Sequence, residues 1–207
     1  MKFEWKKQAK QFYMPKDEPE IVTVPEMKFF MLDGKGNPNS EEFSEAVRVL
    51  YSLAYAVKML PKKGVTPEGY FDYTVFPLEG VWDLAEEARG LDKLDKDQLI
   101  YTIMIRQPDF VTEEIVQVVM ENVRKTKYHP LLETVRFGSL EEGVCVQMMH
   151  HGSYDSEPNS FARMEEFSRM NNLKRISKTH REIYISDARK TSPDKLKTVL
   201  RFQVEQQ

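Results

Sequence analysis

The feature that most constrains the fold of this chain is an order of predicted elements that occurs twice. In the first half, apolar periodicity predicts a strand at residues 28–33, a helix at 40–60, a β-rich segment at 70–77 and a strand at 99–106. The second half repeats this order with a strand at residues 144–151, a helix at 158–172, and strands at 179–187 and 197–204. A strand–helix–strand–strand unit that occurs twice predicts an α+β fold, in which both units contribute to one mostly antiparallel sheet with helices on one face.

Local signals mark where helices begin and how the chain divides. Ser40 and Thr112 are each followed by two glutamates, which is typical of a helix N-terminus. The strands at residues 135–140 and 144–151 are predicted to form a hairpin across residues 141–143. Charged residues between Asp83 and Gln98 predict a solvated connection. We expect one domain over residues 1–207, composed of an N-terminal arm (1–24), a first unit (25–108), a linking helix (109–130) and a second unit (131–207).

The strand at residues 179–187, THREIYISD, carries a carboxylate next to an aromatic residue. Alternation puts Ile183 and Ile185 on one face and Glu182 and Tyr184 on the other. We expect the isoleucines to face the helices together with Val144, Val146, Tyr101, Ile103, Ile105, Leu200 and Phe202. The opposite face would then carry Glu182, Tyr184, Met149, His151, Thr102, Met104, Arg106 and Arg201. Such a mixture is typical both of a ligand cleft and of a half-solvated sheet.

Composition and charge exclude several classes of protein. The 30 basic and 33 acidic residues are mixed along the chain, so no basic stripe indicates a nucleic-acid interface. The lone Cys145 excludes an internal disulfide and fits a reducing compartment. The N-terminus lacks the apolar run of a signal peptide, and no segment is long and apolar enough to span a membrane. We therefore expect a soluble, cytoplasmic protein; the sequence does not indicate its oligomeric state.

The chain offers no set of metal ligands. His150 and His151 are adjacent, so on a strand they point to opposite faces and cannot hold one ion together. No second histidine or cysteine stands at a spacing typical of zinc. We expect neither a metal nor a cofactor.

Five segments in order carry a resemblance to a known family. They are MKFFMLDGKGNPN, FPLEGVWDL, IRQPDFVT, HHGSYDSE and HREIYISD, the last with the trailing SPDKLKTVLRFQV. Together they resemble the stand-alone GyrI-like small-molecule-binding proteins over residues 24–204. The resemblance implies two strand–helix–strand–strand units related by a pseudo-twofold axis, with a ligand cleft between them.

The resemblance also implies what the cleft binds. Related domains are the drug-sensing parts of multidrug-responsive transcription activators, in which a pocket glutamate meets lipophilic cations; the matching residue is Glu182. The stand-alone members that this chain resembles more closely are cyclopropanoid cyclopropyl hydrolases, which open the activated cyclopropane of DNA-alkylating antibiotics and protect the cell. No helix-turn-helix segment precedes the repeat in this chain, so a sensor would need a partner that carries one.

The resemblance therefore predicts an enzyme that adds water to flat, electrophilic aromatic compounds, and the alternative is a protein that binds or senses drugs without turnover. Glu182 is the predicted base and Tyr154 the predicted hydrogen-bond donor. The predicted ligand contacts are Trp82, Tyr184, Met149, His151, Met104 and Asp72. Burial beside aromatic rings would raise the pKa of Glu182, whereas a surface ion pair with Arg201 or Arg106 would lower it. The alternatives for the other residues are a core-capping Trp82, a surface Tyr154, a turn-forming Asp72 and core-filling methionines.

Overall fold

The computed structural model describes residues 2–86 and 95–207, and its contacts divide the chain into two compact units. Unit 1 consists of Met1–Glu4, Met27–Leu78 and Asp83–Leu140, and unit 2 of Trp5–Glu26, Glu79–Trp82 and Glu141–Gln207. Part of the connection expected between Asp83 and Gln98 lies outside the described residues. Each unit is described by itself.

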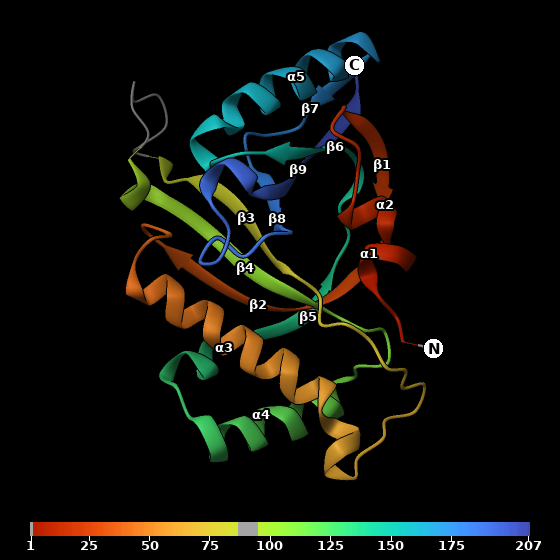
Figure 1. Ribbon diagram of the computed structural model, residues 1–207, viewed down its shortest axis with the longest axis vertical. Helices are drawn as coiled ribbons and strands as arrows, with labels where there is room; N and C mark the ends of the chain where they lie inside the picture. The colour runs from red at the N-terminus through yellow and green to blue at the C-terminus, as the bar shows by residue number, and fades with distance from the viewer. Residues whose placement is uncertain (1, 87–94) are drawn as a thin grey trace. The chain divides into compact units, whose positions relative to one another are not determined.

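Unit 1 is a three-stranded antiparallel sheet covered by two helices (Figure 1). Its central strand β2 (Met27–Lys35) pairs with β4 (Leu99–Gln107) on one side and β5 (Arg136–Leu140) on the other. Helix α3 (Glu41–Lys58) packs on β2 and β4, and α4 (Glu113–Lys127) packs beside α3. Short 3₁₀ helices span Leu60–Lys63, Lys96–Gln98 and Pro130–Thr134.

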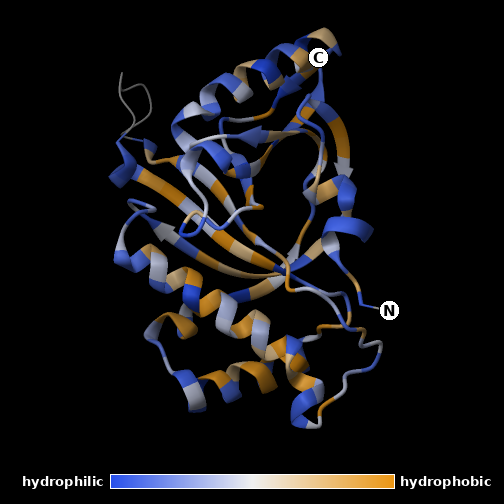
Figure 2. Cartoon of the chain, in the orientation of Figure 1, coloured by the Kyte–Doolittle hydropathy of each residue, from blue (hydrophilic) through white to orange (hydrophobic). Residues whose placement is uncertain are grey.

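Both predicted helix caps of unit 1 are confirmed. The Ser40 hydroxyl accepts a hydrogen bond from the Phe43 amide at 3.2 Å, and the Thr112 hydroxyl accepts one from the Ile115 amide at 3.5 Å. These side chains satisfy amide groups that the helix itself leaves without a partner. Hydrophobic residues recur along β2, β4 and α3 (Figure 2), and the core they build includes Phe30, Leu32, Leu50, Leu53, Ile103 and Ile105.

Unit 2 is an antiparallel sheet in the order β1–β6–β9–β8–β3. Its strands are β1 (Glu20–Val24), β3 (Leu78–Leu84, of which residues 79–82 belong to this unit), β6 (Gly143–His151), β8 (His180–Tyr184) and β9 (Lys197–Gln206). The short strand β7 (Leu173–Arg175) also pairs with β9. Helices α1 (Trp5–Gln8), α2 (Lys10–Tyr13) and α5 (Glu157–Met170), with 3₁₀ helices at Tyr154–Ser156 and Pro193–Lys195, complete the unit.

Helix α5 packs on one face of this sheet. Its Met164 is fully buried, with Phe161 and Phe167 packed partly buried around it. The strands supply the rest of this hydrophobic core, namely Val146, Met148, Leu173, Leu200, Phe202 and Val204. The order β2–α3–β3–β4 recurs as β6–α5–β8–β9, with the short β7 inserted between α5 and β8, and the strand pairs named above are antiparallel. The predicted α+β fold with a repeated unit is confirmed.

Three local predictions are corrected. Residues 135–140 and 144–151 form no hairpin, because β5 pairs with β2 in unit 1 whereas β6 pairs with β1 and β9 in unit 2. Residues 70–77 form no strand; within them only Tyr73 makes an isolated bridge, to Phe3. The expected N-terminal arm contributes β1 to the sheet and buries Trp5 and Tyr13, so it belongs to the folded body of unit 2.

The predicted division of the two sheet faces is wrong for β8, although Val146, Leu200 and Phe202 face α5 as predicted. Residues directly opposite each other in an antiparallel pair project to the same face. Glu182 lies opposite Leu200, and Tyr184 lies opposite Thr198, so both glutamate and tyrosine share the face that α5 covers. Ile183 lies opposite Val199 on the other face. Arg201 also lies on that other face, one residue along from Leu200.

Candidate functional site

Glu182 lies in the middle of β8 and is only 9% exposed. His180, two residues earlier on the same face, lies with Nε2 3.1 Å from Glu182 Oε1. Tyr184, two residues later, projects to the same face of the strand as this carboxylate. Because side chains alternate along a strand, His180 lies on one side of the buried Glu182 and Tyr184 on the other, all on the same face.

The neighbouring strand β3 contributes Trp82 and Gly80 to the site. Trp82 lies within β3 opposite His180, and its indole Nε1 donates a hydrogen bond to the Tyr184 hydroxyl at 2.8 Å. Gly80 lies opposite Glu182, and a Cβ there would lie 2.5 Å from Trp82 Nε1. The glycine thus leaves the space into which the indole turns. Trp82 itself lies inside β3 and is 4% exposed.

Tyr154 completes the aromatic group from a different element. It lies in the 3₁₀ helix before α5, is partly exposed, and its ring meets that of Tyr184 edge-on with centroids 6.1 Å apart. Burial and the charges of Glu182, Glu157 and Asp187 raise the pKa of Tyr154 to about 12. Burial and Glu182 likewise raise the pKa of Tyr184 well above its ordinary value. Both hydroxyls therefore keep their protons at neutral pH and act as hydrogen-bond donors.

A second acid at this site was not predicted from the sequence. Glu157 is the first residue of α5 and is 6% exposed. Burial, the adjacent Glu182 and, more weakly, Asp155 raise the pKa of Glu157 well above that of an ordinary glutamate. The only sequence signal for Glu157 was its place one residue before the helix predicted at residues 158–172.

The alternative arrangement, an ion pair between Glu182 and Arg201, does not form. The Arg201 guanidinium lies on the other face of the sheet, where Nη1 contacts Glu142 Oε2 at 2.9 Å and Nη2 contacts Gln147 Oε1 at 2.8 Å. Arg106, the other candidate partner, lies in unit 1, where its guanidinium is stacked 4.8 Å from the centre of the Phe76 ring.

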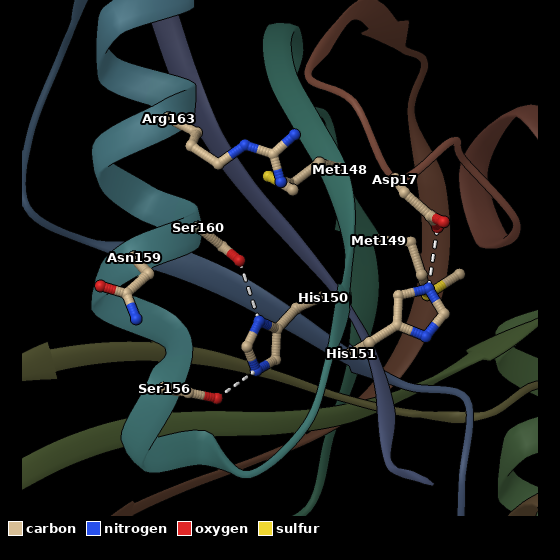
Figure 3. A pocket seen from close by; sticks show the side chains of 9 residues that line it. All are labelled: Asp17, Met148, Met149, His150, His151, Ser156, Asn159, Ser160 and Arg163. Atoms are coloured by element: carbon tan, nitrogen blue, oxygen red, sulfur yellow. Dashed lines mark hydrogen bonds and ion pairs between the residues drawn. The ribbon is translucent and has the colours of Figure 1, made fainter. Parts of the chain in front are cut away.

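Met149 and His151 lie apart from the Glu182 cluster. Both line a surface cavity of about 230 Å³ between β6, the start of α5 and the segment around Asp17 (Figure 3). His151 contacts Asp17 at 2.8 Å. His150 projects to the opposite face, and its ring lies between the Ser160 hydroxyl at 2.9 Å and the Ser156 hydroxyl at 3.2 Å (Figure 3).

The two remaining predicted ligand contacts, Met104 and Asp72, belong to unit 1. Met104 is 1% exposed in β4. Asp72 is exposed and forms an ion pair with Lys58, which lowers the pKa of its carboxyl group. Of the predicted site residues, the structure thus brings together Glu182, Tyr184, Trp82 and Tyr154.

Comparison with known proteins identifies the family. The family model of the GyrI-like small-molecule binding domain matches residues 17–205. This chain belongs to that family. Two solved structures named as hydrolases from Listeria innocua are 41% and 42% identical to this GyrI-like chain, cover 99% of it and 100% of their own length, and superpose with TM-scores of 0.89 and 0.91.

A more distant structure shares the fold only. The C-terminal domain of EcmrR is 16% identical over 92% of this chain and 98% of its own, with a TM-score of 0.55. No curated protein matches the chain. Among the described residues, no helix is long and apolar enough to cross a membrane.

Proposed function

We propose that this GyrI-like protein binds flat aromatic xenobiotics against the Trp82–Tyr184–Tyr154 group and hydrolyses electrophilic ones with Glu182 as base. The observation that carries the proposal is a nearly buried glutamate on the same strand face as Tyr184, whose hydroxyl is hydrogen-bonded to Trp82 and whose ring meets that of Tyr154. A desolvated carboxylate beside aromatic walls is what a general base for a flat substrate requires. The highly similar relatives that are named as hydrolases support a hydrolytic reaction.

An activated cyclopropane conjugated to a ring carbonyl, as in DNA-alkylating antibiotics, is the proposed electrophile. Glu182 removes a proton from water while the water oxygen bonds to the strained methylene carbon. The carbon–carbon bond breaks, and its electron pair moves through the ring to the carbonyl oxygen. The Tyr154 hydroxyl donates a hydrogen bond to the charge that develops there. The proton on Glu182 then passes to this oxygen, leaving an alcohol and a phenol.

Replacing Glu182 by Gln tests the assignment of the base. Hydrolysis of a cyclopropane-bearing alkylator should fall by roughly 10²- to 10⁴-fold while the compound still binds, because Gln keeps the shape but accepts no proton. Mass spectrometry of the recovered compound measures the gain of one water. Full hydrolysis by Glu182→Gln would refute the role of Glu182.

The second candidate function is drug binding without turnover. It is favoured by the same geometry, because an acid among aromatic rings attracts lipophilic cations through its charge and through the ring quadrupoles. A panel of cationic and alkylating compounds separates the two functions. Tight binding with every compound recovered intact would support a binding protein, and water addition to the alkylators would support the hydrolase.

A further inference from the structure

His180 contacts the carboxylate of Glu182 directly. Its Nε2 lies 3.1 Å from Glu182 Oε1, a distance typical of a hydrogen bond between a nitrogen donor and an oxygen. Only 21% of the His180 side chain is exposed, and Glu182 is nearly buried. Little water therefore competes for this bond, and a hydrogen bond is stronger in such surroundings than in water.

The ring of His180 is held by two further groups. Its Nδ1 lies 3.4 Å from the Lys178 carbonyl oxygen, two residues earlier in the chain. On another side, the Phe161 ring of α5 meets the imidazole edge-on, with ring centroids 4.7 Å apart. Phe161 itself packs against the hydrophobic core of unit 2. Because a carbonyl group and an aromatic ring fix the imidazole, it presents Nε2 to Glu182 in one orientation.

The chemistry of the neighbours decides which atom of this contact carries the hydrogen. Carbonyl and carboxylate oxygens only accept hydrogen bonds, whereas a histidine ring nitrogen can donate one. A base must be ionised before it can take up a proton, so Glu182 in its proposed role is a carboxylate. The hydrogen then belongs to His180 Nε2, which donates it to Oε1. This bond occupies one oxygen of the carboxylate and leaves the other for water.

We propose that His180 is the positioning residue for Glu182: its Nε2–H holds Oε1, and Oε2 is the oxygen that deprotonates water. This inference rests on the proposed function of Glu182 as the base. A glutamate side chain has several rotatable bonds, and an anchor at Oε1 keeps Oε2 in the orientation that proton transfer requires.

His180 keeps its Nε2 hydrogen throughout the reaction. The water O–H bond breaks toward Glu182 Oε2 while the water oxygen bonds to the substrate carbon. The electron pair of the broken carbon–carbon bond moves to the ring oxygen, which then takes up the proton from Oε2. Glu182 returns to a carboxylate that is still held at Oε1, so the site is ready for the next substrate.

Replacing His180 by Phe and by Gln separates the hydrogen bond from the shape of the ring. His180→Phe keeps a flat ring without a donor, so kcat should fall by about 10²-fold, the effect expected when a reacting group is misplaced by about 1 Å. KM should stay close to that of the parent, because the Trp82, Tyr184 and Tyr154 rings remain. His180→Gln restores an N–H donor and should recover most of the lost kcat.

His129→Phe is the matched control for these variants. His129 is also a histidine beside a carboxylate, with Nε2 3.5 Å from Glu45 Oε2, but it belongs to unit 1. Its replacement should leave kcat and KM unchanged. Full kcat in His180→Phe would overturn the inference. A His180→Gln variant as slow as His180→Phe would also overturn it, because the imidazole would then do more than donate a hydrogen bond.

Nitrogen-15 NMR tests the hydrogen bond without substrate, because it distinguishes a ring nitrogen that carries hydrogen from one that does not. The His180 signals are assigned by elimination, through single replacements of His129, His150 and His151, the other histidines of the chain. We expect a hydrogen on His180 Nε2 at neutral pH. Its signal should shift in Glu182→Gln, since a neutral amide is a weaker acceptor than a carboxylate. An Nε2 without hydrogen, or a signal identical in both proteins, would refute the proposal.

The proposed function and the role of His180 fail in different ways. A parent that hydrolyses no alkylator but shows the Glu182-dependent Nε2–H signal would overturn the hydrolase and uphold the hydrogen bond. A parent that hydrolyses alkylators with no hydrogen on Nε2 would overturn the role of His180 and uphold the hydrolase. Circular dichroism of each variant establishes that the comparison is made between folded proteins.

Discussion

At the scale of single residues, the site depends on one residue that has no side chain. Gly80 lies opposite Glu182, and a Cβ at this position would lie 2.5 Å from Trp82 Nε1 and 3.2 Å from the Tyr184 hydroxyl. The absence of a side chain at Gly80 therefore leaves space for the hydrogen bond between the Trp82 indole and the Tyr184 hydroxyl.

Replacing Gly80 by Ala should displace the Trp82 indole and break its hydrogen bond to Tyr184. Overpacking of this kind costs roughly 1–3 kcal/mol of unfolding free energy. Ligand affinity and the rate of hydrolysis should also fall, because the Trp82 indole is displaced. The fluorescence of Trp82, measured in a Trp5→Phe background, should change as well. Gly138→Ala is the control, because its Cβ would meet Met31 at 3.5 Å, an ordinary contact. Unchanged fluorescence in Gly80→Ala would contradict the packing argument.

At the scale of elements, the start of α5 matters because it carries both Tyr154 and Glu157. His150 on β6 holds this region through its contacts with the Ser153 carbonyl at 3.1 Å and the hydroxyls of Ser156 and Ser160. Gly152 begins the loop with φ of +119°, a conformation that other residues rarely adopt. The position of two site residues is therefore determined by a turn outside the site.

Replacing Gly152 by Ala should strain this turn and bring a Cβ to 3.1 Å from the Ser156 hydroxyl. We expect a loss of about 1–2 kcal/mol of stability from the backbone and a larger fall in kcat than in ligand affinity, because Tyr154 and Glu157 shift. Gly143→Ala is the control, since it also has positive φ but meets no atom within 4 Å and lies far along β6 from the site loop. Equal effects of both variants on kcat would contradict the expectation.

At the scale of the whole molecule, each unit has its own core, and unit 2 also contains a buried network of opposite charges. On the sheet face opposite α5, Arg181 contacts Glu79 at 2.7 Å and Glu142 at 2.9 Å, and Arg201 contacts Glu142 at 2.9 Å. Arg201 Nη2 also donates to the Phe12 carbonyl at 2.6 Å. The network thus fastens the N-terminal segment of the unit to the central strands.

Replacing Glu142 by Gln should destabilise the protein at neutral pH by roughly 3–5 kcal/mol, because two buried arginines then lack a shared anion. Although burial opposes its ionisation, the charges of Arg181 and Arg201 lower the pKa of Glu142. The contribution of Glu142 to folding stability is therefore present above its unfolded pKa of about 4.3. This contribution is lost as pH falls through the lowered pKa of the folded state. Urea unfolding of parent and variant should converge in strong acid; a constant difference at every pH would refute this account.

The sequence by itself determined the α+β class, the repeated unit, the two helix caps at Ser40 and Thr112, and the alternation that puts Glu182 and Tyr184 on one face of a strand. These features depend on neighbouring residues, and local periodicity and capping chemistry report them directly. The membership of this chain in the GyrI-like family also followed from its motifs, because their order along the chain is itself sequence information.

Only the tertiary structure decided which side chains meet Glu182. Gly80 is 102 residues away along the chain yet directly opposite in the sheet, and Glu157 arrives from the start of a helix. The same registers put Arg201 on the opposite face and separate Met149 and His151 from Glu182. The physical reason is that a one-residue change of strand register moves every side chain to the other face, and register is set by contacts between distant segments.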